Sequence, residues 1–348
     1  MRLSEKARRR LFVYSRRAGR CLTGGLRHPC LFMHLPKCGG TSLANALYAA
    51  VPLHQRIAVL DAVAIRRAAA IGAFGRDDPW LCHEDLAQGH HAVALREQLA
   101  LTHMAEGARL LHGHLPLSAS VLQHVAPHYR IVTLMREPVA RSLSNFQMAV
   151  RAGLIAPDID AWLEGPFGRR HATVFLRYLS GSNAVVPADE HAALRRAEAA
   201  LKRIALIGFL DALPDFVAGF RRQFGVRIAM PHFNAAPVAT SVSAPAFAPS
   251  PAAGAAGQPI ADKTQHDARQ ARQKGRYKAG HKNAPKDGQN GALSAVQLSP
   301  TQRQKLEALC LPDLFLYAAA RRAACAEAAA CSSGPDAEGI GPLDAALG

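Results

Sequence analysis

Three short segments hold residues whose types and spacing suit the binding of an anion and the transfer of a proton. The first reads Pro-Lys-Cys-Gly-Gly-Thr-Ser over 36–42. Glycines let backbone N–H groups approach an anion, and a helix that begins there adds partial positive charge. We therefore expect a phosphate cradle made by Lys37, Cys38, Gly39, Gly40, Thr41 and Ser42. A simple turn that caps a helix has the same composition, so that interpretation stays open.

The second segment begins where an apolar run ends and continues into a helix-like stretch. Arg136 follows the run, and Ser144 comes eight residues later, about two helical turns along. A guanidinium with a nearby hydroxyl suits a phosphate monoester, which accepts charge-assisted hydrogen bonds. Open α/β sheets bind their ligands at the carboxyl ends of the strands, where Arg136 is expected to lie. Arg141 fits a salt-bridging position on the surface.

The third segment, His112-Gly113-His114, suits general-base catalysis. Two histidines at this spacing lie on the same side of an extended chain. Imidazole titrates near neutral pH, so either side chain could accept a proton from a hydroxyl group. A metal site is the alternative, but no third ligand follows at a recognisable spacing. Both histidines remain candidates for the base.

Alternating strands and helices must position these segments. Short apolar runs at 30–34, 129–135 and 205–209 predict buried parallel strands. The stretches 42–50, 139–150, 190–203 and 213–224 predict helices. Further helices are expected after Ser299 and after Asp313. The pattern predicts a three-layer α/β fold with a mostly parallel central sheet between helices.

The positive charge of the chain is concentrated in two segments. Of a net charge of +16, most lies in residues 1–27, with nine Lys/Arg and one acid, and in 262–287, with eight and three. We expect a flexible basic tail over 1–28, an inserted segment poor in apolar residues over about 236–292, and a flexible tail over 323–348. Contact of the N-terminal tail with an anionic polymer or a membrane surface is the alternative.

Cysteine usage and hydropathy indicate a location. The seven cysteines have no CxxC pair and no regular spacing, which favours a reducing compartment. The apolar run at 11–14 is too short for a signal peptide or a membrane span. The sequence therefore predicts a cytoplasmic protein without a membrane span.

Taken together, the three segments resemble the family of sulfotransferases that includes the heparan-type 2-O carbohydrate enzymes. Residues 32–42 are similar to that family's 5′-phosphosulfate loop, and 132–144 to its 3′-phosphate motif. His112-Gly113-His114 looks like the segment that carries the family's catalytic histidine. Weaker similarities follow at 177–181, 207–209 and 313–318, so the resemblance covers about 30–235 and 298–322. Cys38 in the loop, the apolar stretch 173–176 and the insertion depart from the family pattern.

The resemblance implies a sulfotransferase domain over 29–322 with a P-loop-like fold. No Walker A motif is present, because Lys37 precedes both glycines. The implied donor is 3′-phosphoadenosine 5′-phosphosulfate (PAPS), without a metal, and the implied acceptor is a hydroxyl of an oligosaccharide or glycoconjugate. Lys37 is expected at the leaving phosphate, Arg136 and Ser144 at the 3′-phosphate, and His114 or His112 as the base.

Two other functions are consistent with parts of the sequence. A nucleotide-dependent phosphotransferase would use the same phosphate cradle, but it needs a Walker lysine and a magnesium-binding acid after a strand. A nucleic-acid-binding protein would explain the net charge of +16, but it predicts aromatic residues among the basic ones on a folded surface. No specific nucleic-acid partner is therefore expected.

Overall fold

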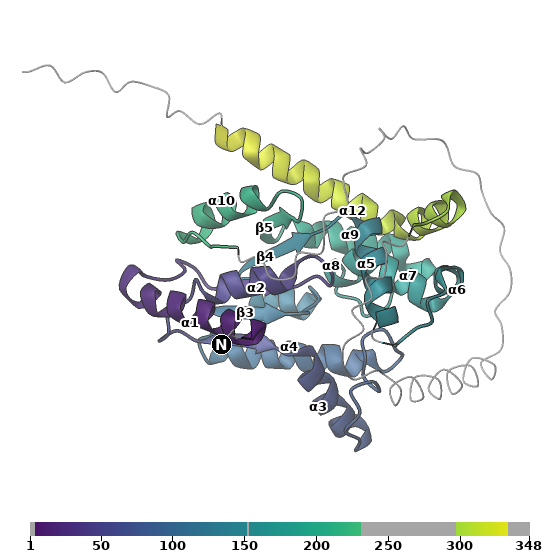
Figure 1. Ribbon diagram of the computed structural model, residues 1–348, viewed down its shortest axis with the longest axis horizontal. Coiled ribbons are helices and arrows are strands. Elements are labelled where there is room, and N and C mark those ends of the chain that lie inside the picture. Colours follow the sequence, from purple (N-terminus) through teal and green to yellow (C-terminus); the bar gives the residue numbers. More distant parts are fainter. Residues whose placement is uncertain (1–3, 152, 231–296, 333–348) are drawn as a thin grey trace, which may run out of the picture.

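A parallel sheet of five strands forms the centre of the protein. The computed structural model describes residues 4–151, 153–230 and 297–332. The strands are β1 (Cys30–Met33), β2 (Ile57–Leu60), β3 (Leu110–Gly113), β4 (Arg130–Met135) and β5 (Ile204–Phe209), in the order β2-β3-β1-β4-β5. Every neighbouring pair is parallel, so each connection crosses over a face of the sheet. Helices cover both faces (Figure 1), and the predicted α/β fold with a central parallel sheet is confirmed.

One face of the sheet is covered by α2 (Gly40–Tyr48) and α10 (Leu213–Phe224). Cys30 and Phe32 of β1 point to this face and pack with Leu43 and Leu47 of α2. Three phenylalanines of α10, Phe216, Phe220 and Phe224, complete the layer. Because both faces of β1 and β4 are covered, β1 is apolar throughout and β4 is mostly apolar, with Arg130 and Thr133 as its polar residues, instead of alternating.

Helices from distant parts of the chain cover the other face. They are α3 (Ala62–Phe74), α4 (Gly89–Ala105), the short π-helix η1 (Val121–Val125), α8 (Val174–Leu179) and α9 (Glu190–Leu201). A third apolar cluster joins α5 (Pro138–Arg151), α6 (Ile159–Glu164) and α7 (Pro166–Ala172) to α12 (Pro300–Ser332). A single turn of 3-10 helix, η2 (Pro187–Asp189), precedes α9.

The basic N-terminal segment is a helix, so the expectation of a flexible tail over 1–28 is wrong for residues 5–23. Helix α1 (Glu5–Thr23) begins after Ser4, whose hydroxyl accepts a hydrogen bond from the Ala7 N–H. Arg17 holds it to the domain by donating to the carbonyl oxygens of Val51, Pro52 and Gln55 at 2.9–3.1 Å. The charge of this segment predicted that it would be solvated, but Arg17 instead attaches the helix to the rest of the domain. Membrane contact through this segment stays a prediction.

The C-terminal part also differs from the sequence prediction. Two helices and a flexible tail after residue 322 were expected, whereas α12 is one continuous helix from Pro300 to Ser332. Pro312 lies inside it, where its ring removes one N–H from the helical ladder. Helix α12 packs against α5, α6, α7, α8 and α9, and this packing outweighs the local effect of the proline.

Several sequence predictions concern residues outside the described ranges. The insertion expected at about 236–292 lies there, as does the end of the C-terminal tail after residue 332. Within the described ranges, no helix has the length and apolar character needed to cross a membrane. Six described cysteines are free thiols: Cys21, Cys30, Cys38, Cys82, Cys310 and Cys325.

A fully buried ion pair joins α5 to α12. Arg141 and Asp313 are both 0% exposed and lie 3.7 Å apart, so Arg141 is not the surface residue that the sequence indicated. The Asp313 carboxylate also accepts the N–H groups of Phe175 and Leu176 at 2.8 Å, at the start of α8. Burial raises the pKa of Asp313 to about 6 despite Arg141 and these donors, so the carboxylate is ionised at pH 7. The pair and its two N–H donors therefore link α5, α8 and α12.

We expect Asp313→Ala to lower the free energy of unfolding by about 3–5 kcal/mol, because it leaves a buried guanidinium without its counter-ion. Asp211→Ala is the matched control. Asp211 pairs with Arg321 at the surface and is 65% exposed, so its loss should cost about 1 kcal/mol or less. Chemical denaturation of the two variants measures the difference. Equal losses would contradict a structural role for the buried pair.

Candidate functional site

The three segments singled out in the sequence meet at one edge of the sheet. They lie at the carboxyl ends of β1, β3 and β4, and β1 lies between the other two strands. The chain leaves β1 toward β2 on one side of the sheet and leaves β4 toward β5 on the other side. Such a point, where the connections diverge, forms the ligand crevice of open parallel sheets. The topology therefore places the candidate residues at this crevice.

The loop after β1 holds its backbone in a conformation suited to an anion. Lys37 has φ 67° and Gly39 has φ 76°, and Lys37 is the only non-glycine residue with a positive φ in the described part of the chain. Residues that carry a side chain rarely adopt this backbone conformation, so the positive φ of Lys37 costs conformational energy that the rest of the loop must offset. Gly39 is the N-cap of α2, and no side chain caps the first turn. The loop thus presents uncapped N–H groups beside a lysine.

A close contact fixes the loop to the end of β1. A Cβ atom on Gly40 would lie 1.9 Å from Nε2 of His34, so only glycine fits at this position. The His34 ring therefore lies directly against the first residue of α2. This contact places the start of the helix and the histidine beside each other.

Three cations surround the loop. Lys37 and Arg136 are half-buried, and Arg151 lies at the exposed end of α5. Burial lowers the pKa of Lys37, and the charges of Arg151 and Arg136 lower it further, which shows that the three lie within electrostatic range. Among the described residues none of them forms an ion pair with a carboxylate. A cluster of this kind is stabilised by binding an anion.

Glu137, the acidic residue next to this cluster, accepts hydrogen bonds from the backbone. Both oxygens of Glu137 accept backbone N–H groups at the start of α5, from Val139 at 2.9 Å and Ala140 at 2.7 Å. This is a capping interaction, which a carboxylate at a helix N-terminus makes favourably. Glu137 therefore secures α5 and leaves the charge of Arg136 for a ligand.

The remaining predicted donor residues differ in exposure. Thr41 is exposed, whereas Ser42 and Ser144 are half-buried, the latter on α5. The Cys38 side chain is 1% exposed, and burial raises the pKa of its thiol to about 12. Cys38 is consequently neutral and packed inward, and its contribution to an anion site is its backbone.

Histidines from two neighbouring strands form a stack beside the loop. The His34 ring lies between His114, at 4.5 Å between centroids, and His112, at 5.4 Å. Phe32 stacks on His112 at 5.0 Å, and the Tyr48 hydroxyl lies 2.5 Å from the Nδ1 atom of His112. His112 is directly opposite Phe32 in the register of β1 and β3, which brings the rings together.

Hydrogen bonding distinguishes the two candidate bases. Nδ1 of His114 lies 2.7 Å from the carbonyl oxygen of His34, which can only accept, so Nδ1 carries the proton. Nε2 of His114 is then the atom with a free lone pair. In His112 the corresponding Nε2 is buried and has no hydrogen-bond partner. His114 is therefore better arranged to accept a proton from a bound group.

All three rings are neutral at pH 7. Burial lowers the pKa of His114 to about 4, and the nearby Arg96 contributes. Burial likewise lowers the pKa of His34 and of His112 to about 3. A neutral imidazole is the form that acts as a base. Among the described residues no group of three or more His, Cys, Asp or Glu side chains is arranged to hold a metal ion.

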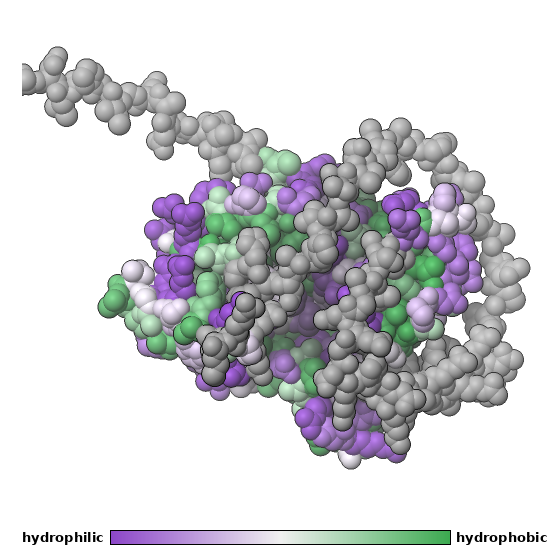
Figure 2. Space-filling model, in the orientation of Figure 1, coloured by the Kyte–Doolittle hydropathy of each residue, from purple (hydrophilic) through white to green (hydrophobic). Residues whose placement is uncertain are grey.

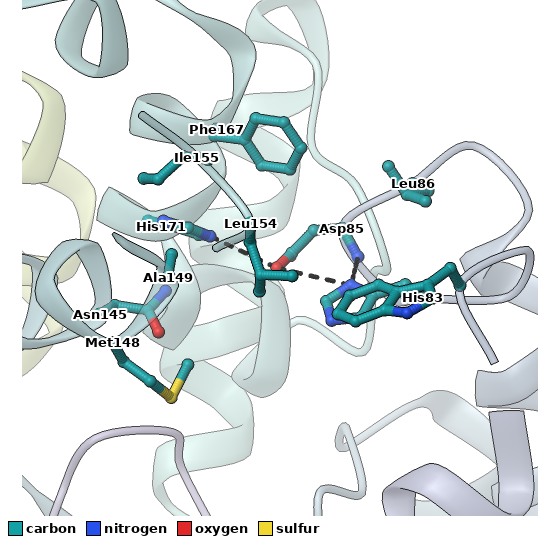
Figure 3. A pocket seen from close by; sticks show the side chains of 11 residues that line it. His83, Asp85, Leu86, Asn145, Met148, Ala149, Leu154, Ile155, Phe167 and His171 are labelled. Atoms are coloured by element: carbon teal, nitrogen blue, oxygen red, sulfur yellow. Dashed lines mark hydrogen bonds and ion pairs between the residues drawn. The ribbon is translucent and has the colours of Figure 1, made fainter. Parts of the chain in front are cut away.

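Some residues at the site were not identified from the sequence. Arg151, at the end of α5, lies within electrostatic range of Lys37. An arginine at a predicted helix end gives no signal of that proximity. The apolar stretch 173–176 left the acceptor side without polar residues. In the structure residues 174–176 belong to the core, and Nε2 of His171, in the preceding helix α7, lies 3.4 Å from the Asp85 carboxylate (Figure 3).

We expect Gly40→Ala to disrupt the site, because the added methyl group would occupy the position of the His34 ring. Overpacking of this kind costs about 1–3 kcal/mol of unfolding free energy. Gly72→Ala, in α3, is the control: its Cβ meets nothing within 4 Å, and helix propensity predicts a gain of about 0.5–1 kcal/mol. Thermal denaturation separates the two, and a Gly40→Ala protein as stable as the wild type would show that His34 can move freely.

Comparison with protein-family models and with curated proteins gives no match to this chain. Its function is therefore inferred from the residues at the carboxyl edge of β3, β1 and β4. These residues provide uncapped loop amides, three cations that have no acidic partner in the described part of the chain, and a neutral histidine with a free lone pair.

Proposed function

We propose that the protein is a PAPS-dependent sulfotransferase that transfers a sulfuryl group to a hydroxyl of a carbohydrate acceptor. The observation that carries this proposal is the grouping, at one sheet edge, of an anion cradle, a neutral histidine and cations that pair with no carboxylate among the residues the structure describes. The resemblance of residues 32–42 and 132–144 to the donor motifs of that family supports it. In this proposal the fold is P-loop-like but lacks a Walker A motif.

The donor would occupy two anion-binding positions. The loop amides, Lys37 and the α2 N-terminus suit the 5′-phosphosulfate group, because fixed N–H groups and a helix dipole stabilise anions. Arg136 and Ser144 suit the 3′-phosphate, which distinguishes PAPS from ATP. No hydrogen bond joins Arg136 to Ser144 within the described residues, so both remain available to such a group.

The reaction is an in-line displacement at sulfur. The acceptor oxygen attacks the sulfur atom, the bond from sulfur to the 5′-phosphate oxygen breaks, and 3′-phosphoadenosine 5′-phosphate leaves. Nε2 of His114 takes the hydroxyl proton as the new bond forms. Lys37 neutralises the charge that grows on the leaving phosphate oxygen, helped by the loop amides. His112, whose Nε2 is buried, then supports the stack beneath His34.

A phosphotransferase is the closest alternative, since it would use the same cradle. It differs in the donor, ATP in place of PAPS, and a nucleic-acid-binding protein would differ again by preferring an oligonucleotide. Binding measured in parallel for 3′-phosphoadenosine 5′-phosphate, ATP and an oligonucleotide distinguishes all three. The sulfotransferase proposal requires the first to bind most tightly.

We expect the protein to bind 3′-phosphoadenosine 5′-phosphate much more tightly than AMP, because only the former carries the group that Arg136 and Ser144 contact. Arg136→Ala should remove about 2–4 kcal/mol of that preference, the value of a desolvated charge-assisted contact. Titration calorimetry measures both ligands on both proteins. Equal affinities of the wild type for the two nucleotides would refute the assignment.

We expect His114→Ala to lower kcat by about a hundred-fold or more, the usual contribution of a general base, with little change in nucleotide affinity. His112→Ala should have the smaller effect. The neutral form of His114 is the base, so kcat/KM for the acceptor should rise with pH through its pKa and then stay level. Because that pKa is lowered to about 4 in the free protein, the level region should include pH 7. Activity that falls as the pH rises from 5 to 7 would contradict this role.

A further inference from the structure

Helix α1 exposes a row of apolar side chains. Leu11, Tyr14 and Leu22 are 60%, 59% and 92% exposed, and Ala18 is exposed as well. Tyr14, Ala18 and Leu22 follow Leu11 by three, seven and eleven positions, which are the spacings of one side of a helix. We call these four residues the outer row.

Arginines attach the opposite side of α1 to the domain. Arg17 donates to carbonyl oxygens of the loop 51–55, and Arg20 donates to the carbonyl oxygen of Arg227 at 2.9 Å. A helix on the surface of a domain usually buries its apolar side and exposes its charged side. Helix α1 instead attaches through arginines, so its outer row stays uncovered by the described residues.

Basic residues flank the outer row on both sides. At about 3.6 residues per turn, Arg8 lies beyond Leu11 on one side of the row and Arg10 lies beyond Tyr14 on the other. Both arginines are exposed. Residues 5–23 hold seven Lys/Arg and one acid. Figure 2 shows apolar and hydrophilic surface next to each other at the end of the molecule where Figure 1 places α1. A surface that covers the outer row must therefore offer both apolar groups and negative charge.

More positive charge lies at the amino ends of the strands, just after α1. Burial lowers the pKa of His28, and the charges of Arg130, Arg109 and Arg27 lower it further, so these three arginines lie around it. Arg109 also donates to the carbonyl oxygen of Leu26 at 2.5 Å. None of the three pairs with a carboxylate in the described part of the chain. The charge of α1 thus continues onto this edge, which is opposite to the proposed donor crevice.

An anionic bilayer matches this combination of groups. A helix with apolar residues on one side and arginines at the boundary lies in the plane of a membrane surface, with the apolar side among the acyl chains. Arginine side chains then reach the headgroup phosphates. Helix α1 is also not a membrane span, because no described helix has the length and apolar character for one.

Two other partners fit less well. A second copy of the chain, docked through the same row, would bring Arg8 and Arg10 of both copies together, and like charges in an interface cost free energy. A nucleic acid is bound through its phosphates and through aromatic stacking, which gives Leu11 and Leu22 no role.

We propose that α1 docks the protein onto the surface of a membrane that contains anionic phospholipids. Leu11, Tyr14 and Leu22 enter the boundary between headgroups and acyl chains. Arg8 and Arg10 contact headgroup phosphates on either side of the row. The docking uses no residue of the proposed donor site, so it does not depend on the sulfotransferase function.

Co-sedimentation of the full chain with lipid vesicles tests this proposal. Vesicles of phosphatidylcholine and phosphatidylserine in equal parts should bind the protein, and vesicles of phosphatidylcholine alone should bind it about ten-fold or more weakly. Each arginine near an anionic surface strengthens binding by about five-fold, so Arg8→Gln with Arg10→Gln should weaken binding to the mixed vesicles by about ten-fold or more.

A neutral substitution separates the apolar contribution from the charge. Leu11→Ser with Leu22→Ser should also weaken binding to the mixed vesicles by about ten-fold or more, because two apolar side chains no longer enter the bilayer. The matched control is Ile71→Ser with Leu311→Ser, at positions 51% and 58% exposed on α3 and α12, and it should bind as the wild type does. All these positions are exposed, so thermal denaturation should show the same Tm for every variant.

Tryptophan fluorescence gives a second readout. The emission of Leu22→Trp should shift to shorter wavelength on the mixed vesicles, relative to the wild type, whereas that of Ile71→Trp should not. This measurement reports insertion of the outer row itself, and it needs no loss of binding.

Four outcomes would overturn the proposal. They are no binding to the mixed vesicles, equal binding to both kinds of vesicle, equal effects of the two serine variants, and vesicle binding that only the arginine variant weakens, which indicates an anionic polymer such as a nucleic acid. A dimer in light scattering that Leu11→Ser with Leu22→Ser converts to a monomer would assign the outer row to a second copy instead. Binding of 3′-phosphoadenosine 5′-phosphate in solution should be equal for all variants, so the donor site and the membrane surface are tested separately.

Discussion

The contact between the His34 ring and the backbone of Gly40 determines the geometry of the candidate site. Since no side chain fits at Gly40, the first residue of α2 lies against a histidine at the end of β1. The loop that joins them is then short and strained, with Lys37 and Gly39 at positive φ. The backbone carbonyl oxygen of His34 in turn accepts the hydrogen bond that orients the His114 ring. One close approach thus aligns the anion cradle with the proposed base.

The distribution of acids explains why the cations around the loop are free for a ligand. Glu137 caps α5, and Asp313 pairs with Arg141 and accepts two backbone N–H groups. Both carboxylates therefore have structural roles. Lys37, Arg136 and Arg151 are left with mutual repulsion, which a bound phosphate or phosphosulfate would relieve.

The sequence predicted the parts of the fold that depend on local pattern. The strands after Pro29 and Tyr129 and the helix over 213–224 follow from apolar runs and periodicity. Features that depend on distant contacts were not predictable. Arg17 anchors α1 through carbonyl groups more than thirty residues away, and packing on five helices keeps α12 continuous through Pro312. The local sequence around Arg17 or Pro312 does not indicate either interaction.

The same distinction applies to the site. The loop, Arg136 and the two histidines were recognisable because each segment has its own pattern at the end of a strand. Arg151 was not, since only the path of α5 brings it within electrostatic range of Lys37. The choice of His114 over His112 as the proposed base also required the structure, because it depends on which Nε2 atom is buried without a partner.

A crystal structure of the protein with 3′-phosphoadenosine 5′-phosphate would test the central claim most directly. The account predicts the 5′-phosphate over the amides of residues 38–42 beside Lys37, and the 3′-phosphate on Arg136 and Ser144. It also predicts that Nε2 of His114 faces the space next to the 5′-phosphate. A nucleotide bound at another edge of the sheet, or a 3′-phosphate that contacts neither Arg136 nor Ser144, would contradict the account.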